Sequence, residues 1–176
     1  AVSTDGGAVS ITLGGTGDHQ ITLGNGNDTY TSTSTAGEDV TATAGNNTIS
    51  TGAGADAVTL GTGNDNVSGE AGNDTFTVAT ANFTTDDTIS GGAGTDSITL
   101  SNAATVVDAD FTNVTTTETL TATGGASSVT TGALSAAAGI TTVVMSTGSD
   151  TITIGANSLS TLGVTATTGG TAGGND

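Results

Sequence analysis

A nine-residue unit recurs through the first hundred residues, and it limits the possible folds more than any other feature. Cut at Ala42, the chain reads ATAGNNTIS, TGAGADAVT, LGTGNDNVS and GEAGNDTFT over residues 42–77. In each block the fourth position is Gly, the sixth is Asn or Asp, and the eighth is apolar. A unit this short buries its apolar residue only when copies stack on one another, so the repeat predicts a solenoid.

Further copies extend this register in both directions. One inserted residue, Ser32, separates two of them, and a short break at residues 78–81 precedes the next pair. The additional blocks span residues 14–22, 23–31, 33–41, 82–90, 91–99 and, in isolation, 145–153. We therefore expect a regular roll over residues 1–100 and a less regular β-repeat region over 101–176, with one short helical turn around residues 132–139. The final GGND resembles an interrupted repeat turn, so we expect a fragment of a longer protein.

The spacing within one block predicts its local structure. Glycines at the second and fourth positions permit positive φ and close backbone packing in a tight turn. The residues that follow suit a short strand whose middle, apolar side chain points inward. The predicted fold class is all-β, a parallel β-roll or β-helix.

The charge balance excludes several partners and requires another. The chain has 17 acidic residues and no Lys or Arg. Binding to nucleic acids or to anionic membranes depends on cationic side chains, and no apolar run is long enough to insert directly into a membrane. Two carboxylates about 5 Å apart repel by ~3 kcal/mol at an effective dielectric near 20. Stacked acids in such a chain therefore call for bound cations.

The sixth position of the block is the candidate ligand. Carboxylate and carbonyl oxygens without thiolate or imidazole suit Ca²⁺ better than Zn²⁺ or copper, and we predict several calcium ions. If each coil takes two blocks, Glu38, Asp56 and Asp74 stack in one ladder and Asn47 and Asp65 in another, with uncharged Asn47 weakening its site. The predicted ligands are Asp28, Glu38, Asn47, Asp56, Asp65, Asp74, Asp87, Asp96 and Asp150, with turn carbonyls near Gly24, Gly26, Gly52, Gly54, Gly61, Gly63, Gly72, Gly92 and Gly94.

The block GGAGTDSIT at residues 91–99 resembles the RTX (repeats-in-toxin) nonapeptide at every position. That resemblance implies a calcium-binding parallel β-roll in residues 1–100, in an extracellular protein exported by type I secretion. The stretch at residues 110–153 is similar to β-strand repeats of RTX-related bacterial S-layer proteins.

Two other features have ordinary interpretations beside functional ones. His19 stands at the sixth position of a degenerate block, and we interpret it as an exposed histidine in a broken turn, without a metal or catalytic role. Thr-rich stretches such as residues 29–35 and 115–123 suit strand surfaces, although flat Thr rows could also bind ice. GTGND at residues 61–65 is similar to the outward pattern of RTX-type antifreeze domains.

The functional prediction is a non-enzymatic structural protein. We expect a calcium-dependent, self-assembling segment of an S-layer, filament or matrix protein at the bacterial surface, forming a homo-oligomer or polymer, with a cell-surface polysaccharide as a possible further partner. Exposed strand edges at solenoid ends favour such association. The alternatives are an adhesin or ice-binding module with a Thr-rich face, and a folding and secretion appendage of an exported enzyme.

Overall fold

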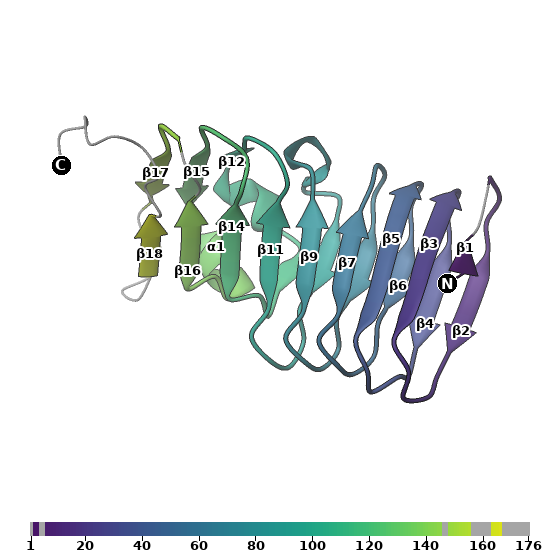
Figure 1. Ribbon diagram of the computed structural model, residues 1–176. Helices are drawn as coiled ribbons and strands as arrows, with labels where there is room; N and C mark the ends of the chain where they lie inside the picture. The colour runs from purple at the N-terminus through teal and green to yellow at the C-terminus, as the bar shows by residue number, and fades with distance from the viewer. Residues whose placement is uncertain (1, 4–5, 146–147, 156–162, 167–176) are drawn as a thin grey trace.

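The computed structural model describes residues 2–3, 6–145, 148–155 and 163–166. Over these residues the chain winds as a parallel β-solenoid, with successive strands falling alternately on two facing sheets (Figure 1). Sheet one contains, in spatial order, β1 (Val2–Ser3), β3 (His19–Asn25), β5 (Glu38–Ala44), β7 (Ala57–Leu60), β9 (Thr75–Val78), β11 (Ser97–Leu100), β14 (Thr119–Ala122), β16 (Thr142–Met145) and β18 (Gly163–Ala166). The predicted all-β parallel solenoid is confirmed.

The opposite side of the solenoid is formed by two shorter sheets. Sheet two contains β2 (Ser10–Leu13), β4 (Thr29–Ser32), β6 (Thr48–Ser50), β8 (Asn66–Ser68), β10 (Thr88–Ser90) and β13 (Val114–Thr115). Sheet three contains β12 (Thr105–Val106), β15 (Ser128–Thr131) and β17 (Thr151–Ile154). Sheet one continues across residue 100, because β11 pairs with β14, and the change there is the replacement of sheet two by sheet three.

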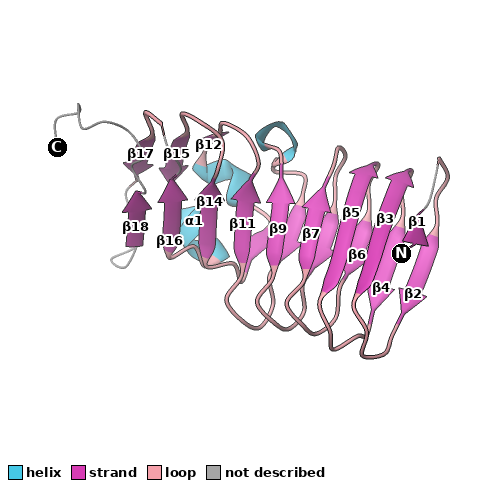
Figure 2. Cartoon of the chain, viewed as in Figure 1, coloured by secondary structure: helices cyan, strands magenta, loops and turns pink. Residues whose placement is uncertain are grey.

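Within the described residues, three short helical segments interrupt the coils, and Figure 2 shows them in cyan. A 3-10 helix, η1 (Thr80–Asn82), occupies the break after residue 78, and a second, η2 (Asp108–Phe111), precedes β13. The helix α1 (Ala133–Ala138) confirms the predicted helical turn, and it ends at Gly139 with φ of 105°. These insertions enlarge the coil without breaking sheet one.

The core between the sheets consists of the eighth-position side chains and the residues two places later. In sheet one, Val40, Val58 and Phe76 face inward in consecutive coils, followed by Ile98 and Leu120 in the same register. Each of them is at most 1% exposed. The apolar positions predicted from the repeat are therefore the core, in agreement with the two-residue period of a strand.

The turns pack closely enough that glycine is required at certain positions. Gly72 has φ of 139°, and a Cβ there would overlap the carbonyl group of Gly54 in the preceding coil. Gly7, by contrast, has nothing within 4 Å of its would-be Cβ.

We expect Gly72→Ala to lower the free energy of unfolding by about 2–4 kcal/mol, because the backbone conformation and the contact with Gly54 are both incompatible with a side chain. Gly7→Ala, the matched control, should stay within ~0.5 kcal/mol. Urea unfolding in saturating calcium, followed by circular dichroism, measures both. Equal stabilities of the two variants would contradict the packing of these turns.

Within the described residues, no helix has both the length and the apolar character needed to cross a membrane.

Candidate metal centre

Acidic side chains stack in two rows, one along each main sheet. We call the first the sheet-one ladder. It lies where the sheet-one strands begin and consists of His19, Glu38, Asp56, Asp74, Asp96 and Glu118. The sheet-two ladder lies directly before the strands of sheet two and consists of Asp28, Asn47, Asp65 and Asp87. The stacking of Glu38, Asp56 and Asp74 and of Asn47 and Asp65, predicted from the spacing of 18 residues, is confirmed.

One oxygen of each ladder aspartate accepts a main-chain hydrogen bond from the preceding coil. The main-chain N–H of Asp56 donates to Oδ1 of Asp74 at 2.9 Å, and the N–H of Asp74 donates to Oδ1 of Asp96 at 2.7 Å. The sheet-two ladder repeats this pattern, with the N–H of Asn47 donating to Oδ1 of Asp65 at 3.0 Å. The acids are therefore part of the coil-to-coil hydrogen bonding, which fixes their carboxylates inside the turns.

The second carboxylate oxygen of several ladder aspartates has no hydrogen bond within the described part of the chain. Oδ2 of Asp28, Asp56, Asp74 and Asp96 is buried and has no hydrogen-bond partner among the described residues. A buried acceptor without a partner costs about 1–3 kcal/mol, and more when it is charged. Burial raises the pKa of Asp56 and Asp96 above its ordinary value and raises the pKa of Asp74 to about 6. A cation beside these oxygens would remove both penalties.

The turn backbone brings further oxygens to the same places. At Gly69, a would-be Cβ meets Oδ2 of Asp74 and, at 2.7 Å, the carbonyl oxygen of Gly91. Among the described residues no three His, Cys, Asp or Glu side chains converge on one point. An ion held here would thus take few carboxylates and most of its ligands from main-chain carbonyls. Such an all-oxygen donor set fits calcium, which commonly binds carbonyl and carboxylate oxygens together.

The sheet-two ladder is better satisfied by the protein itself. The amide Nδ2 of Asn47 donates to Oδ1 of Asp65 at 2.9 Å, and the N–H of Thr84 donates to Oδ2 of Asp87 at 3.0 Å. Burial nevertheless raises the pKa of Asp65. Asn47 thus contributes amide hydrogen bonds where the neighbouring coils have carboxylates, and its predicted weakening of a calcium site stays a prediction.

Glu38 differs from the aspartates below it in the sheet-one ladder. Its carboxylate accepts a hydrogen bond from the Tyr30 hydroxyl at 2.8 Å and from the Ser32 hydroxyl at 3.2 Å, and Nδ1 of His19 lies 3.0 Å from both of its oxygens. The prediction of an exposed His19 is wrong: the side chain is 28% exposed and stacks on Glu38. Sequence reasoning missed this contact, although the register of the degenerate block places His19 at the sixth position, one coil before Glu38.

We expect Glu38→Gln to leave the number of bound calcium ions unchanged, since the oxygens of Glu38 already have protein partners. Its charge-assisted hydrogen bonds should weaken, lowering the free energy of unfolding by about 1–3 kcal/mol. Calcium counting by isothermal titration calorimetry decides the first point and urea unfolding the second. Loss of one ion in Glu38→Gln would instead support the prediction that Glu38 is a calcium ligand.

The remaining predicted residues fall partly outside this arrangement. Asp150 directly precedes β17 of sheet three and accepts the N–H of Ser127 at 2.8 Å, and residues 146–147 of its predicted turn lie outside the described residues.

Gly24 is not in a turn, because β3 extends to Asn25 and pairs with β5 to its end. Seven of the nine predicted turn glycines have positive φ, namely Gly26, Gly52, Gly54, Gly63, Gly72, Gly92 and Gly94. Gly61 is instead needed for close approach, with its would-be Cβ 2.7 Å from the carbonyl oxygen of Ala42.

Sequence reasoning also missed Glu118, which extends the sheet-one ladder by one coil. Its Oε2 accepts the N–H of Asp96 at 2.7 Å. Its segment, TTTETLTAT at residues 115–123, has no glycine and therefore does not match the nine-residue unit. The available signal was the interval: Glu118 follows Asp96 by 22 residues, as Asp96 follows Asp74.

Fold and ladders together define a β-roll built to hold cations between its coils. The family model described as RTX calcium-binding nonapeptide repeat (4 copies) matches residues 41–76 and 84–102. The chain therefore contains RTX repeats, which are calcium-binding repeats. RTX repeats are typical of extracellular proteins exported by type I secretion. No curated protein and no solved structure matches the chain.

Proposed function

We propose that this chain is a non-catalytic, self-assembling segment of an extracellular structural protein, such as an S-layer, filament or matrix subunit. In this proposal calcium drives both the folding of the coils and the association of subunits. The observation that carries it is the combination of calcium-binding ladders with a stack of parallel strands whose edges are unprotected.

The strand edges lack the usual means of preventing association. Natural proteins commonly place Lys or Pro on edge strands to block pairing with another chain. This chain contains neither residue. At one end of the described solenoid, β2 pairs only with β4, and at the other, β17 pairs only with β15 (Figure 1). Within the described residues, the outer edges of these two strands have no strand partner, and in this proposal a second copy stacked end to end supplies the next coil.

The buried acids favour a structural role and export before folding. In the described part of the chain, the buried aspartates accept main-chain hydrogen bonds between coils, which places them inside the wall of the solenoid. Four of their oxygens have no hydrogen-bond partner among the described residues, and in this proposal calcium ions bind there. Where free calcium is scarce, as in the cytosol, the coils would stay unfolded, and type I secretion of an unfolded chain would be followed by folding outside the cell.

Light scattering with size-exclusion chromatography tests assembly. Calcium-loaded protein should form particles that grow with protein concentration and dissociate in EGTA, and electron microscopy should show filaments or sheets. A folded, calcium-loaded chain that stays monomeric at high concentration would overturn self-assembly and leave calcium binding intact.

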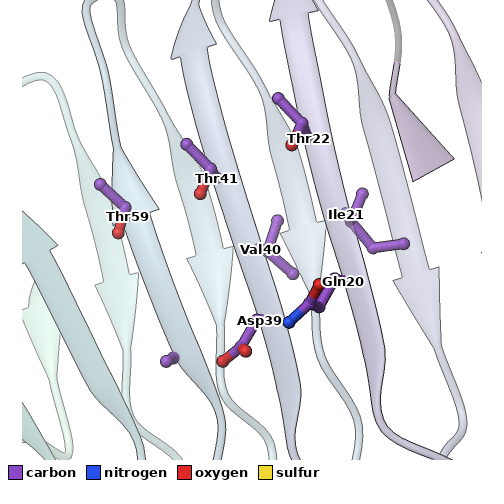
Figure 3. A pocket seen from close by; sticks show the side chains of 8 residues that line it. Gln20, Ile21, Thr22, Asp39, Val40, Thr41 and Thr59 are labelled. Carbon is purple, nitrogen blue, oxygen red and sulfur yellow. The ribbon is translucent and has the colours of Figure 1, made fainter. Parts of the chain in front are cut away.

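A second candidate function rests on the outer face of sheet one. Six threonines occupy one row in register across consecutive strands, namely Thr22, Thr41, Thr59, Thr77, Thr99 and Thr121. Figure 3 shows Thr22, Thr41 and Thr59 aligned in this way, beside Gln20 and Asp39, around an open pocket. Hydroxyl groups repeated at about the 4.8 Å strand spacing suit an ordered ligand surface, as in an ice-binding or adhesive module.

Thermal hysteresis separates this candidate from the first. An ice-binding face should depress the freezing point of a calcium-loaded solution, and Thr41→Tyr within the row should abolish the effect while keeping the far-UV spectrum. Absence of hysteresis in the calcium-loaded protein would remove ice binding and leave the structural role.

A further inference from the structure

The sheet-one ladder extends past the residues that match the calcium-binding repeat. The match ends at residue 102, and Glu118 lies sixteen positions later in a segment without glycine. The strand after it nevertheless keeps register, with Ile98 of β11 opposite Leu120 of β14. Glu118 therefore occupies, beside Asp96, the place that Asp96 occupies beside Asp74.

One buried oxygen of Asp96 lacks a hydrogen-bond partner within the described part of the chain, and Asp96 contacts the coil that contains Glu118. Asp96 is fully buried, and its Oδ2 has no hydrogen-bond partner among the described residues. A would-be Cβ on Gly91 would overlap both Oδ2 of Asp96 and the carbonyl oxygen of Thr116. Both oxygens thus lie close to Gly91, just as Oδ2 of Asp74 and the carbonyl oxygen of Gly91 lie close to Gly69 one coil earlier.

The turn before β14 has a backbone conformation like that of a repeat turn, although it contains no glycine. Thr116 has φ of 49°, in the left-handed region that favours glycine, and it follows Gly92, with φ of 106°, in the next coil. Its hydroxyl accepts the N–H of Gly92 at 2.8 Å, which ties the two turns together. In this conformation the carbonyl oxygen of Thr116 lies close to Gly91, as does Oδ2 of Asp96.

We propose that Asp96, Glu118 and the carbonyl oxygen of Thr116 form a calcium site at the end of the nonapeptide repeats, with Glu118 and Thr116 supplied by a coil beyond the last repeat. The proposal rests on the calcium-binding function of the repeats and extends it by one coil. The ligands are oxygens only, and two carboxylates supply the negative charge that calcium requires. The Glu118 charge adds to burial in raising the pKa of Asp96, which is the effect a bound cation would reverse.

Calcium counting in matched variants tests the site. Glu118→Gln keeps an oxygen that can accept the N–H of Asp96 but removes the charge. Asp39→Asn removes an exposed acid that follows Glu38 in β5 but is not part of the ladder. Asp74→Asn removes a buried ladder acid from within the matched repeats. Isothermal titration calorimetry with calcium should show one ion fewer for Glu118→Gln than for wild type, and the wild-type number for Asp39→Asn.

The outcomes separate this site from the function on which it rests. If Asp74→Asn loses an ion and Glu118→Gln does not, the additional site is refuted and calcium binding by the repeats stands. If the wild-type chain binds no calcium at all, the calcium-binding function itself fails. Should Glu118→Gln lose its β-sheet spectrum, Glu118→Asp replaces it; one ion should then bind at least tenfold more weakly, and unchanged binding would overturn the proposal.

Discussion

Removing calcium at pH 7.5 is expected to unfold most of the solenoid. At a calcium concentration a thousand times Kd, each occupied site stabilises the folded state by about 4 kcal/mol. Three such sites would contribute ~12 kcal/mol, which is as large as the whole unfolding free energy of a typical domain, about 5–15 kcal/mol. The oxygens of Asp56, Asp74 and Asp96 that then lack any partner would oppose folding.

Far-UV circular dichroism during a calcium titration, followed by EGTA, measures this effect. The β-sheet signal should disappear in EGTA and return when calcium is restored, whereas magnesium at the same concentration should restore little, since it dehydrates reluctantly and prefers octahedral sites. A β-sheet spectrum that persists in EGTA, in protein shown by elemental analysis to contain no calcium, would contradict the role given to the ladders.

Acid is expected to substitute for calcium in the metal-free chain. Burial raises the pKa of Asp56, Asp65, Asp74 and Asp96, so the folded state holds more protons than the unfolded state in the range between the ordinary and the raised pKa. Stability therefore rises as pH falls from about 7 towards 4, and this stabilisation is lost again as pH rises through the raised values. For Asp74, a pKa near 6 compared with 3.8 corresponds to ~3 kcal/mol.

Urea unfolding in EGTA between pH 4 and pH 8 measures this dependence. Asp74→Asn is the matched variant, because an amide cannot titrate: without calcium it should be more stable than wild type at pH 7.5, and with calcium less stable. Asp108 should act in the opposite direction. Its partial burial would raise its pKa, but hydrogen bonds from the main-chain N–H groups of Ser135 and Leu134 outweigh this and lower it, so its contribution is lost on acidification. Metal-free stability that declines steadily below pH 7 would refute the prediction.

Much of the solenoid could be derived from the nine-residue period. The inward position of Val58 and Phe76 and the stacking of Asp56 on Asp74 both follow from the spacing, because a strand alternates its faces and two blocks complete one coil. The excess of acids without bases indicated a cation before any geometry was known. The candidate ligands are all oxygen atoms, and this indicated calcium as the cation.

Tertiary structure decided which acids have oxygens left for an ion. Asp96 and Glu38 occupy equivalent positions, yet Oδ2 of Asp96 has no described partner while Glu38 contacts Tyr30, Ser32 and His19. Those contacts join residues from adjacent strands and coils, so the pattern within one nine-residue block cannot predict them. Glu118 is the converse case, joined to the ladder by coil stacking although its own segment lost the repeat. The coil and its need for a cation follow from local spacing and charge, which can be read in the sequence. The positions of the unpaired oxygens depend on how one coil packs on the next.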